Sequence, residues 1–161
     1  IPVGIFNNLT DDQLDAITHI TNRESFENDQ VIIEDGSDGD TMYLLLSGKV
    51  RVTKKLMIKA GKTISESEKE IIELPAEWNP YFGELALFDP TSIRTATVAG
   101  SEGGEYGVIK NADFLALADG DHDIGYFVLR NVLVKQVGVI RKANENTLNL
   151  TTALSFALTS R

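Results

Sequence analysis

Two charged residues of opposite sign, Glu84 and Arg94, lie in one short segment, YFGELALFDPTSIRTATV (81–98), and could bind a polar ligand together. The run ELAL (84–87) can form one helical turn, whose first N–H groups have no partner within the helix. Such N–H groups attract anions. If the chain after the turn folds back over it, the Arg94 guanidinium faces the same pocket as these amides.

The chemistry of this segment suits a ligand that carries both a phosphate and a sugar. An arginine can donate hydrogen bonds to two phosphate oxygens at once. A phosphate repels a nearby carboxylate, so Glu84 is expected to contact a different part of the ligand. A sugar hydroxyl is suitable, because it can donate a hydrogen bond to the carboxylate. Gly83, just before the turn, allows the close approach of backbone and ligand.

Short β-rich runs, separated by turn residues, make up the middle of the chain. Such strands at short spacing predict a sandwich or barrel rather than a parallel sheet. The polar stretch 60–69, inside the long 53–74 connection, is expected to form an exposed hairpin loop or an insertion. The expected strands cover 31–33, 42–46, 49–52, 70–74, 94–99 and 105–109.

Helical patterns flank this β-rich region. Thr10 is a suitable N-cap for a helix whose apolar residues recur at helical spacing up to Ile20. After Asp113, apolar residues at three- and four-residue steps predict an amphipathic helix. We therefore expect one domain over 1–161, divided into an N-terminal helical segment (1–24), a β-roll (25–113) and C-terminal helices (114–161).

The composition is that of a globular domain and excludes several functions. The chain has 161 residues, with 15 Lys+Arg against 24 Asp+Glu and a net charge of −9, which argues against a duplex nucleic-acid surface. No apolar run reaches the roughly 20 residues of a membrane span. The absence of cysteine excludes a disulfide scaffold and a thiolate zinc site, and fits a cytoplasmic location. The start at Ile1 rather than Met suggests a processed or excised chain.

The segment FGELALFDPTSIRTATV resembles the phosphate-binding cassette of cyclic nucleotide-binding domains, F-G-E-[LI]-A-L, a short loop, then R-[AST]-A-T-V. The run MYLLLSGKVRV (42–52) is similar to an earlier strand pair of the same family. The order of helix, strands and helices also matches. The resemblance implies a mainly β fold, an eight-stranded β-roll (jelly-roll barrel) with an N-terminal helix and two C-terminal helices.

The resemblance also implies a role for each matching position. Glu84 would accept a hydrogen bond from the ribose 2′-hydroxyl, Arg94 would pair with the cyclic phosphate, and Gly83 would permit the close approach. Further ligand-binding residues would be the backbone amides of Leu85, Ala86, Thr95 and Ala96, the purine-pocket residues Val50 and Val52, and the base-capping helix around Ile140 and Arg141. Thr95 fits cGMP-preferring members, but cAMP is the commoner ligand. We expect cAMP and keep cGMP open.

The implied function is a non-catalytic regulatory module that binds a cyclic nucleotide and transmits binding through its C-terminal helices. It needs no cofactor and no metal. The alternative is a fold that has lost its ligand and serves as a protein-interaction or dimerisation module. The expected partners are a second copy, bound through the C-terminal helices, or an attached effector domain.

Metal chemistry is disfavoured. A cupin-type metalloenzyme needs converging imidazoles, whereas the two histidines, His19 and His122, flank the β-rich region. The D-x-D-x-D pattern at 119–123 lacks the glycine and glutamate of a calcium loop at its sixth and twelfth positions, which are Ile124 and Arg130. These aspartates are better explained as helix-starting residues.

Overall fold

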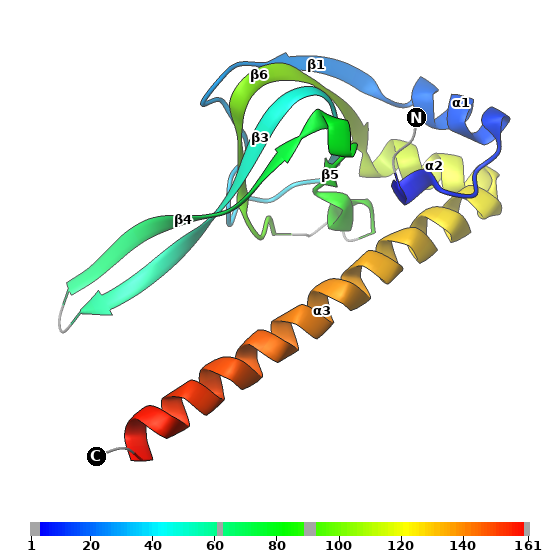
Figure 1. The fold of residues 1–161 in the computed structure, drawn as a ribbon. Helices are drawn as coiled ribbons and strands as arrows, with labels where there is room; N and C mark the ends of the chain where they lie inside the picture. The colour runs from blue at the N-terminus through cyan, green and yellow to red at the C-terminus, as the bar shows by residue number, and fades with distance from the viewer. Residues whose placement is uncertain (1–3, 61–62, 89–92, 160–161) are drawn as a thin grey trace.

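The computed structural model describes residues 4–60, 63–88 and 93–159, which form a β-roll with helices gathered at one end (Figure 1). Six strands form one antiparallel sheet, in the order β1-β6-β3-β4, with β2 paired to β6 and β5 paired to β3. The strands are β1 (Asn22–Phe26), β2 (Val31–Ile33), β3 (Thr41–Ala60), β4 (Thr63–Pro75), β5 (Tyr81–Phe82) and β6 (Thr97–Lys110). The mainly β class with flanking helices is confirmed.

The strand count differs from the expected eight because two strands run through predicted turns. β3 contains both 42–46 and 49–52, and Gly48, with φ of +78°, lies between them. The register against β6 shifts on both sides of Gly48. Such bulges bend a strand without ending it. β6 joins 97–99 to 105–109 in the same way, so the predicted turns became bends in long strands.

The prediction of a loop at 60–69 was wrong for most of these residues. β4 begins at Thr63 and pairs with β3 out to Ala60, so the two strands form a long hairpin that projects from the roll (Figure 1). Residues 61–62 lie outside the described residues. The polar sequence does not prevent a strand here, because the ladder is made by backbone groups.

The helices begin close to their predicted positions. Helix α1 (Asp11–His19) has Thr10 as its N-cap, in a capping box with Gln13, as predicted. Helix α2 (Asn111–Gly120) and helix α3 (His122–Thr159) follow β6. Asp121 accepts a hydrogen bond from the Asp123 amide at 3.0 Å, which supports the helix-starting interpretation of these aspartates.

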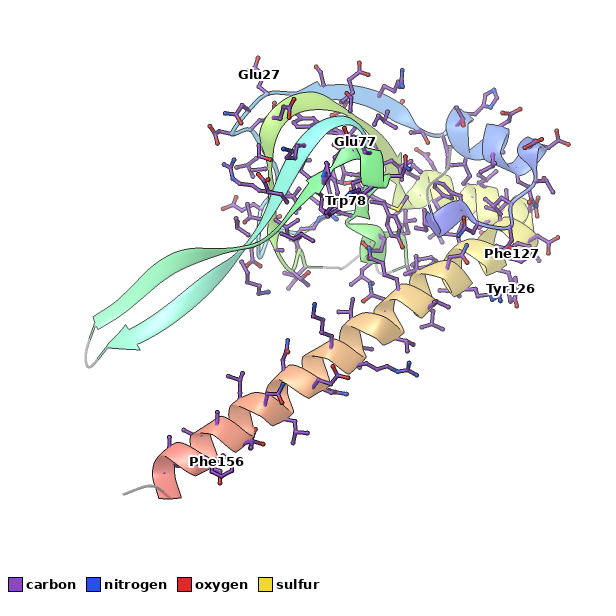
Figure 2. All side chains as sticks on the ribbon, in the orientation of Figure 1. Glu27, Glu77, Trp78, Tyr126, Phe127 and Phe156 are labelled. Atoms are coloured by element: carbon purple, nitrogen blue, oxygen red, sulfur yellow. The ribbon has the colours of Figure 1, made fainter. Side chains whose placement is uncertain are left out.

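Helix α3 is one continuous helix of 38 residues, and it includes Asn144, Asn146 and Asn149, although this residue type has a low helix propensity. It lies beside the other helices at its start and extends away from the roll (Figure 1). Tyr126 and Phe127 mark its near end and Phe156 its far end (Figure 2). No helix in the described part of the chain has the length and apolar character to cross a membrane.

Two clusters of buried side chains hold the segment 82–87 between them. One lies inside the roll and includes Phe82, Val98 and Tyr106. The other joins the helices to the roll and includes Leu87 and Phe114. Because Phe82 is anchored in one cluster and Leu87 in the other, the turn between them has a fixed position.

Candidate functional site

The predicted helical turn is present as a short 3₁₀ helix, η3 (Glu84–Leu87). Gly83 precedes it with φ of +72°, a left-handed conformation that favours glycine. A Cβ there would lie 2.6 Å from Arg94 Nη1, so a side chain would also collide with the guanidinium. The Ala86 amide donates to the Gly83 carbonyl at 3.1 Å. Within the described residues, the Glu84 and Leu85 amides have no such backbone partner.

Asn111, the first residue of α2, holds the other end of this turn. Its Nδ2 donates to the carbonyls of Ala86 and Leu87, at 3.0 and 2.7 Å. The side chain is buried, and a buried amide needs such partners. Sequence reasoning missed Asn111, because a single asparagine at a strand–helix junction carries no signal of what it contacts.

Arg94 reaches the turn, but not from a strand. It precedes β6, and its backbone is held by hydrogen bonds to Ser37 and Gly36, each 2.8 Å long. The expected strand 94–99 therefore begins at Thr97. Arg94 as a whole residue is 7% exposed, and its side chain donates from Nη2 to Thr41 Oγ1 at 2.9 Å and from Nη1 to the Gly83 carbonyl at 3.4 Å.

The buried charge of Arg94 is the main electrostatic feature of this region. Its two hydrogen-bond acceptors among the described residues, a hydroxyl and a carbonyl, are neutral. Burial lowers the pKa of Arg94, against the opposing effects of Tyr43 and Asp40. An arginine stays protonated in proteins, so a cation is held in a partly dehydrated position. Among the described residues no carboxylate forms an ion pair with it, and Asp40 acts on its charge only from a greater distance. An anionic ligand would supply the missing partner.

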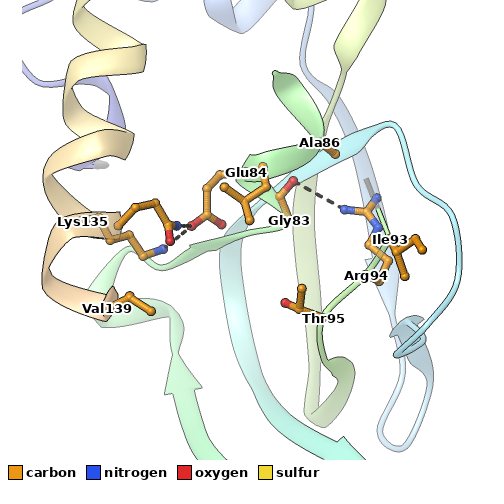
Figure 3. A pocket seen from close by; sticks show the side chains of 10 residues that line it. Gly83, Glu84, Ala86, Ile93, Arg94, Thr95, Lys135 and Val139 are labelled. Carbon is orange, nitrogen blue, oxygen red and sulfur yellow. Dashed lines mark hydrogen bonds and ion pairs between the residues drawn. The ribbon is translucent and has the colours of Figure 1, made fainter. Parts of the chain in front are cut away.

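Glu84 points the other way, toward α3. Its side chain is 10% exposed, and Oε1 accepts hydrogen bonds from Lys135 Nζ and Gln136 Nε2, both at 3.0 Å (Figure 3). Lys135 Nζ also lies 3.9 Å from the centre of the Tyr81 ring. Burial, followed by the charge of Glu84, raises the pKa of Tyr81 to about 12.

Two cavities lie on either side of Gly83, Glu84, Arg94 and Thr95, which line both. One, of about 210 Å³, lies between the turn and α3; its other lining residues are Leu85, Ala86, Ile93, Lys135, Gln136 and Val139. The second, of about 180 Å³, opens toward the roll; its other lining residues are Ile33, Phe82, Val52, Ala96 and Val98. Charged groups therefore lie at the junction, and the second cavity is otherwise apolar.

The structure brings together most of the predicted site residues. All of the predicted residues from Gly83 to Ala86, together with Arg94, Thr95, Ala96 and Val52, line at least one of the cavities. Val50 is fully buried in the core of the roll and lines neither. Ile140 and Arg141 are exposed and line neither, whereas Val139 does. The ligand roles of these residues stay predictions.

Sequence reasoning missed the contributions of Lys135 and Gln136. The apolar spacing of α3 indicated a helix, but it did not indicate which turn of the helix would reach Glu84. The partner of the Arg94 side chain, Thr41, was missed for a similar reason, because it lies at the start of a distant strand.

The family model for the "Cyclic nucleotide-binding domain" matches residues 23–121. Among curated relatives, the cGMP-dependent protein kinase egl-4 of Caenorhabditis briggsae is 31% identical over 97 residues, which are 60% of this chain and 12% of the kinase. The cGMP-dependent protein kinase of Eimeria tenella is 34% identical over 100 residues, 62% of this chain and 8% of the kinase. The chain thus matches only about a tenth of the length of these kinases.

Solved structures share the fold. The catabolite activator protein of Thermus thermophilus superposes with a TM-score of 0.76 at 24% identity, over 92% of this chain and 63% of that one. The regulatory domain of Toxoplasma gondii PKA with cAMP gives a TM-score of 0.59 at 23% identity, over 71% of this chain and 40% of that one. At these identities the similarity establishes the architecture alone.

Proposed function

This chain belongs to the cyclic nucleotide-binding domain family, and we propose that it is a regulatory module that binds cAMP, with cGMP as the second candidate, between η3 and α3. The observation that carries the proposal is the buried Arg94 guanidinium, whose described hydrogen-bond acceptors are neutral. It lies beside a helical turn in which two amides have no backbone partner among the described residues. A cyclic phosphodiester supplies one negative charge and two free oxygens for these donors.

The two cavities can take the two ends of such a ligand. Arg94 and the amides of Glu84 and Leu85 bind the phosphate, at the junction where the cavities meet. Glu84 accepts from a ribose hydroxyl. The Ala86 amide already donates to the Gly83 carbonyl, so it can contact the phosphate only through a bifurcated hydrogen bond. Thr95 lines both cavities, which supports a contact between this residue and the base.

A melting-temperature comparison tests whether the chain binds a cyclic nucleotide and which base it takes. A ligand present at 100 times its Kd stabilises a protein by about 2.7 kcal/mol, which for a domain of this size raises Tm by about 5–10 °C. We expect such a shift with cAMP or cGMP. Cyclic di-GMP and 5′-AMP serve as controls and should shift Tm much less. No shift with any cyclic nucleotide would leave the ligand-free interaction module as the better explanation.

We place the function in binding rather than in catalysis. The described residues that line the two cavities offer an arginine, a lysine, a carboxylate and amides, which suit the retention of an intact nucleotide. Neither a histidine nor a cysteine is among these lining residues. A cytoplasmic location stays a prediction, with which the lack of cysteine is compatible.

The far part of α3 is proposed to pair with a second copy of this chain. Five large apolar residues there are mostly exposed: Leu148, Leu150, Leu154, Phe156 and Leu158. Exposed apolar stripes of this kind mark interaction sites. Leu133, Ile140 and Leu154 recur at multiples of seven, which is the spacing of a coiled-coil seam. An attached effector domain is the alternative partner.

We expect the double substitution of Leu150→Glu and Leu154→Glu to convert a dimer into a monomer. The two charges would be buried in the helix pair, at a cost that exceeds the gain from association. Sedimentation equilibrium measures the mass directly. Asn149→Glu, on the same turns but without an apolar side chain to lose, is the matched control. A wild-type chain that is monomeric at high micromolar concentration would contradict the proposal.

A further inference from the structure

We propose that Lys135 and Gln136 position Glu84 for the ribose hydroxyl, so that α3 and the ligand share one carboxylate. The proposal rests on the function proposed above and deepens it. It makes α3 a part of the ligand site before any ligand is bound, through two side chains that the family resemblance did not indicate.

The two oxygens of Glu84 are in different situations. Oε1 accepts from both Lys135 and Gln136, at 3.0 Å each. Within the described residues, no donor contacts Oε2. A carboxylate has about four lone-pair sites, so Oε2 is able to accept from a ligand. Figure 3 shows the Glu84 carboxylate lying between Lys135 on one side and the part of the site that holds Arg94 on the other.

Lys135 is itself held in place. Its ammonium lies 3.9 Å from the centre of the Tyr81 ring, at a distance that allows a cation–π contact. Tyr81 belongs to β5, which pairs with β3 and leads directly into Gly83. The lysine is therefore positioned by the same strand that delivers the carboxylate, and its geometry does not depend on α3 alone.

Sharing is favoured over competition between the ligand and Lys135. Glu84 is nearly buried, so its charge needs strong donors. A ribose hydroxyl offers one neutral donor and could not replace an ammonium and an amide together. The ligand therefore uses the free oxygen while α3 keeps the other. Because coupling between two binding events is reciprocal, any change that releases α3 from Glu84 also weakens the hydroxyl contact.

The test compares the affinities of cAMP and 2′-deoxy-cAMP, measured by titration calorimetry on the full chain, with the corresponding cGMP pair if cGMP binds more tightly. The wild-type chain should favour the 2′-hydroxyl compound by about tenfold to a hundredfold, which is the range for one hydrogen bond to a charged group. In Lys135→Met, which keeps the side-chain length and removes the charge, this ratio should fall toward one. Lys135→Arg should restore it.

Lys142→Met is the matched control, since Lys142 is an exposed lysine on the same helix and lines neither cavity. Gln136→Met gives a second variant if Lys135→Met does not fold, and should lower the ratio in the same direction. An unchanged ratio in the variants, or tighter binding of the 2′-hydroxyl compound to Lys135→Met, would overturn the proposal while leaving the binding function intact. A folded wild-type chain that binds neither nucleotide would overturn both.

Discussion

Replacing Arg94 with alanine should weaken cyclic nucleotide binding by at least about a hundredfold, since each hydrogen bond to a charged group contributes about 1.5–3 kcal/mol and a phosphate takes two from an arginine. The overall charge of −9 opposes an anionic ligand, so the local cation is indispensable. Titration calorimetry with cAMP and cGMP measures the loss. The fold should persist, because the guanidinium contributes only two hydrogen bonds to the described part of the protein.

Arg51→Ala is the matched control for this experiment. Arg51 pairs with Asp29 at 2.7 Å and donates to the Gly100 carbonyl, on a side of β3 that lines neither cavity. Its loss should leave the affinity within about twofold, because a partly exposed ion pair is worth little. Equal affinities of the wild-type chain and Arg94→Ala would remove Arg94 from its role.

Glu84→Ala should lower the affinity for the 2′-hydroxyl nucleotide by about tenfold to a hundredfold, the range for a lost hydrogen bond to a charged group. The 2′-deoxy analogue should be affected much less, because it makes no such bond. The variant also leaves Lys135 and Gln136 without the carboxylate that they share. Fluorescence competition against a labelled cyclic nucleotide measures both ligands in one assay.

An exposed glutamate on a neighbouring turn, Glu77, provides the control substitution for Glu84, since it lines neither cavity. Glu77→Ala should leave both affinities unchanged. Equal losses for the two nucleotides in Glu84→Ala would show that the carboxylate supports the turn rather than the ribose, and would contradict its assigned role.

The sequence was sufficient where the deciding contacts are local. The Thr10 cap depends on a residue three positions away, and the structure shows the expected capping box. The turn at 84–87 and the left-handed glycine before it are also local features. The number of strands was not predicted correctly, because a glycine such as Gly48 can either end a strand or only bend it. Which of the two happens depends on the register between β3 and β6, and this register is set by residues far apart in the sequence.

The residues that the cassette contributes to the candidate site could be predicted from the sequence, whereas the residues that α3 contributes could not. Glu84 and Arg94 are recognisable by type and spacing, and both line the same cavities. The side chains that hold them, from Thr41 and Lys135, come from distant segments. Their contacts depend on where β3 starts and on how far α3 extends across the turn, which no local pattern specifies.

The most direct test of the central claim is a calorimetric titration of the wild-type chain with cAMP and with cGMP at low ionic strength. We expect one saturable site per chain for at least one of them, and much weaker binding of 5′-AMP, which lacks the cyclic diester. Absence of heat from both nucleotides at several temperatures, together with unchanged melting of a folded sample, would contradict it.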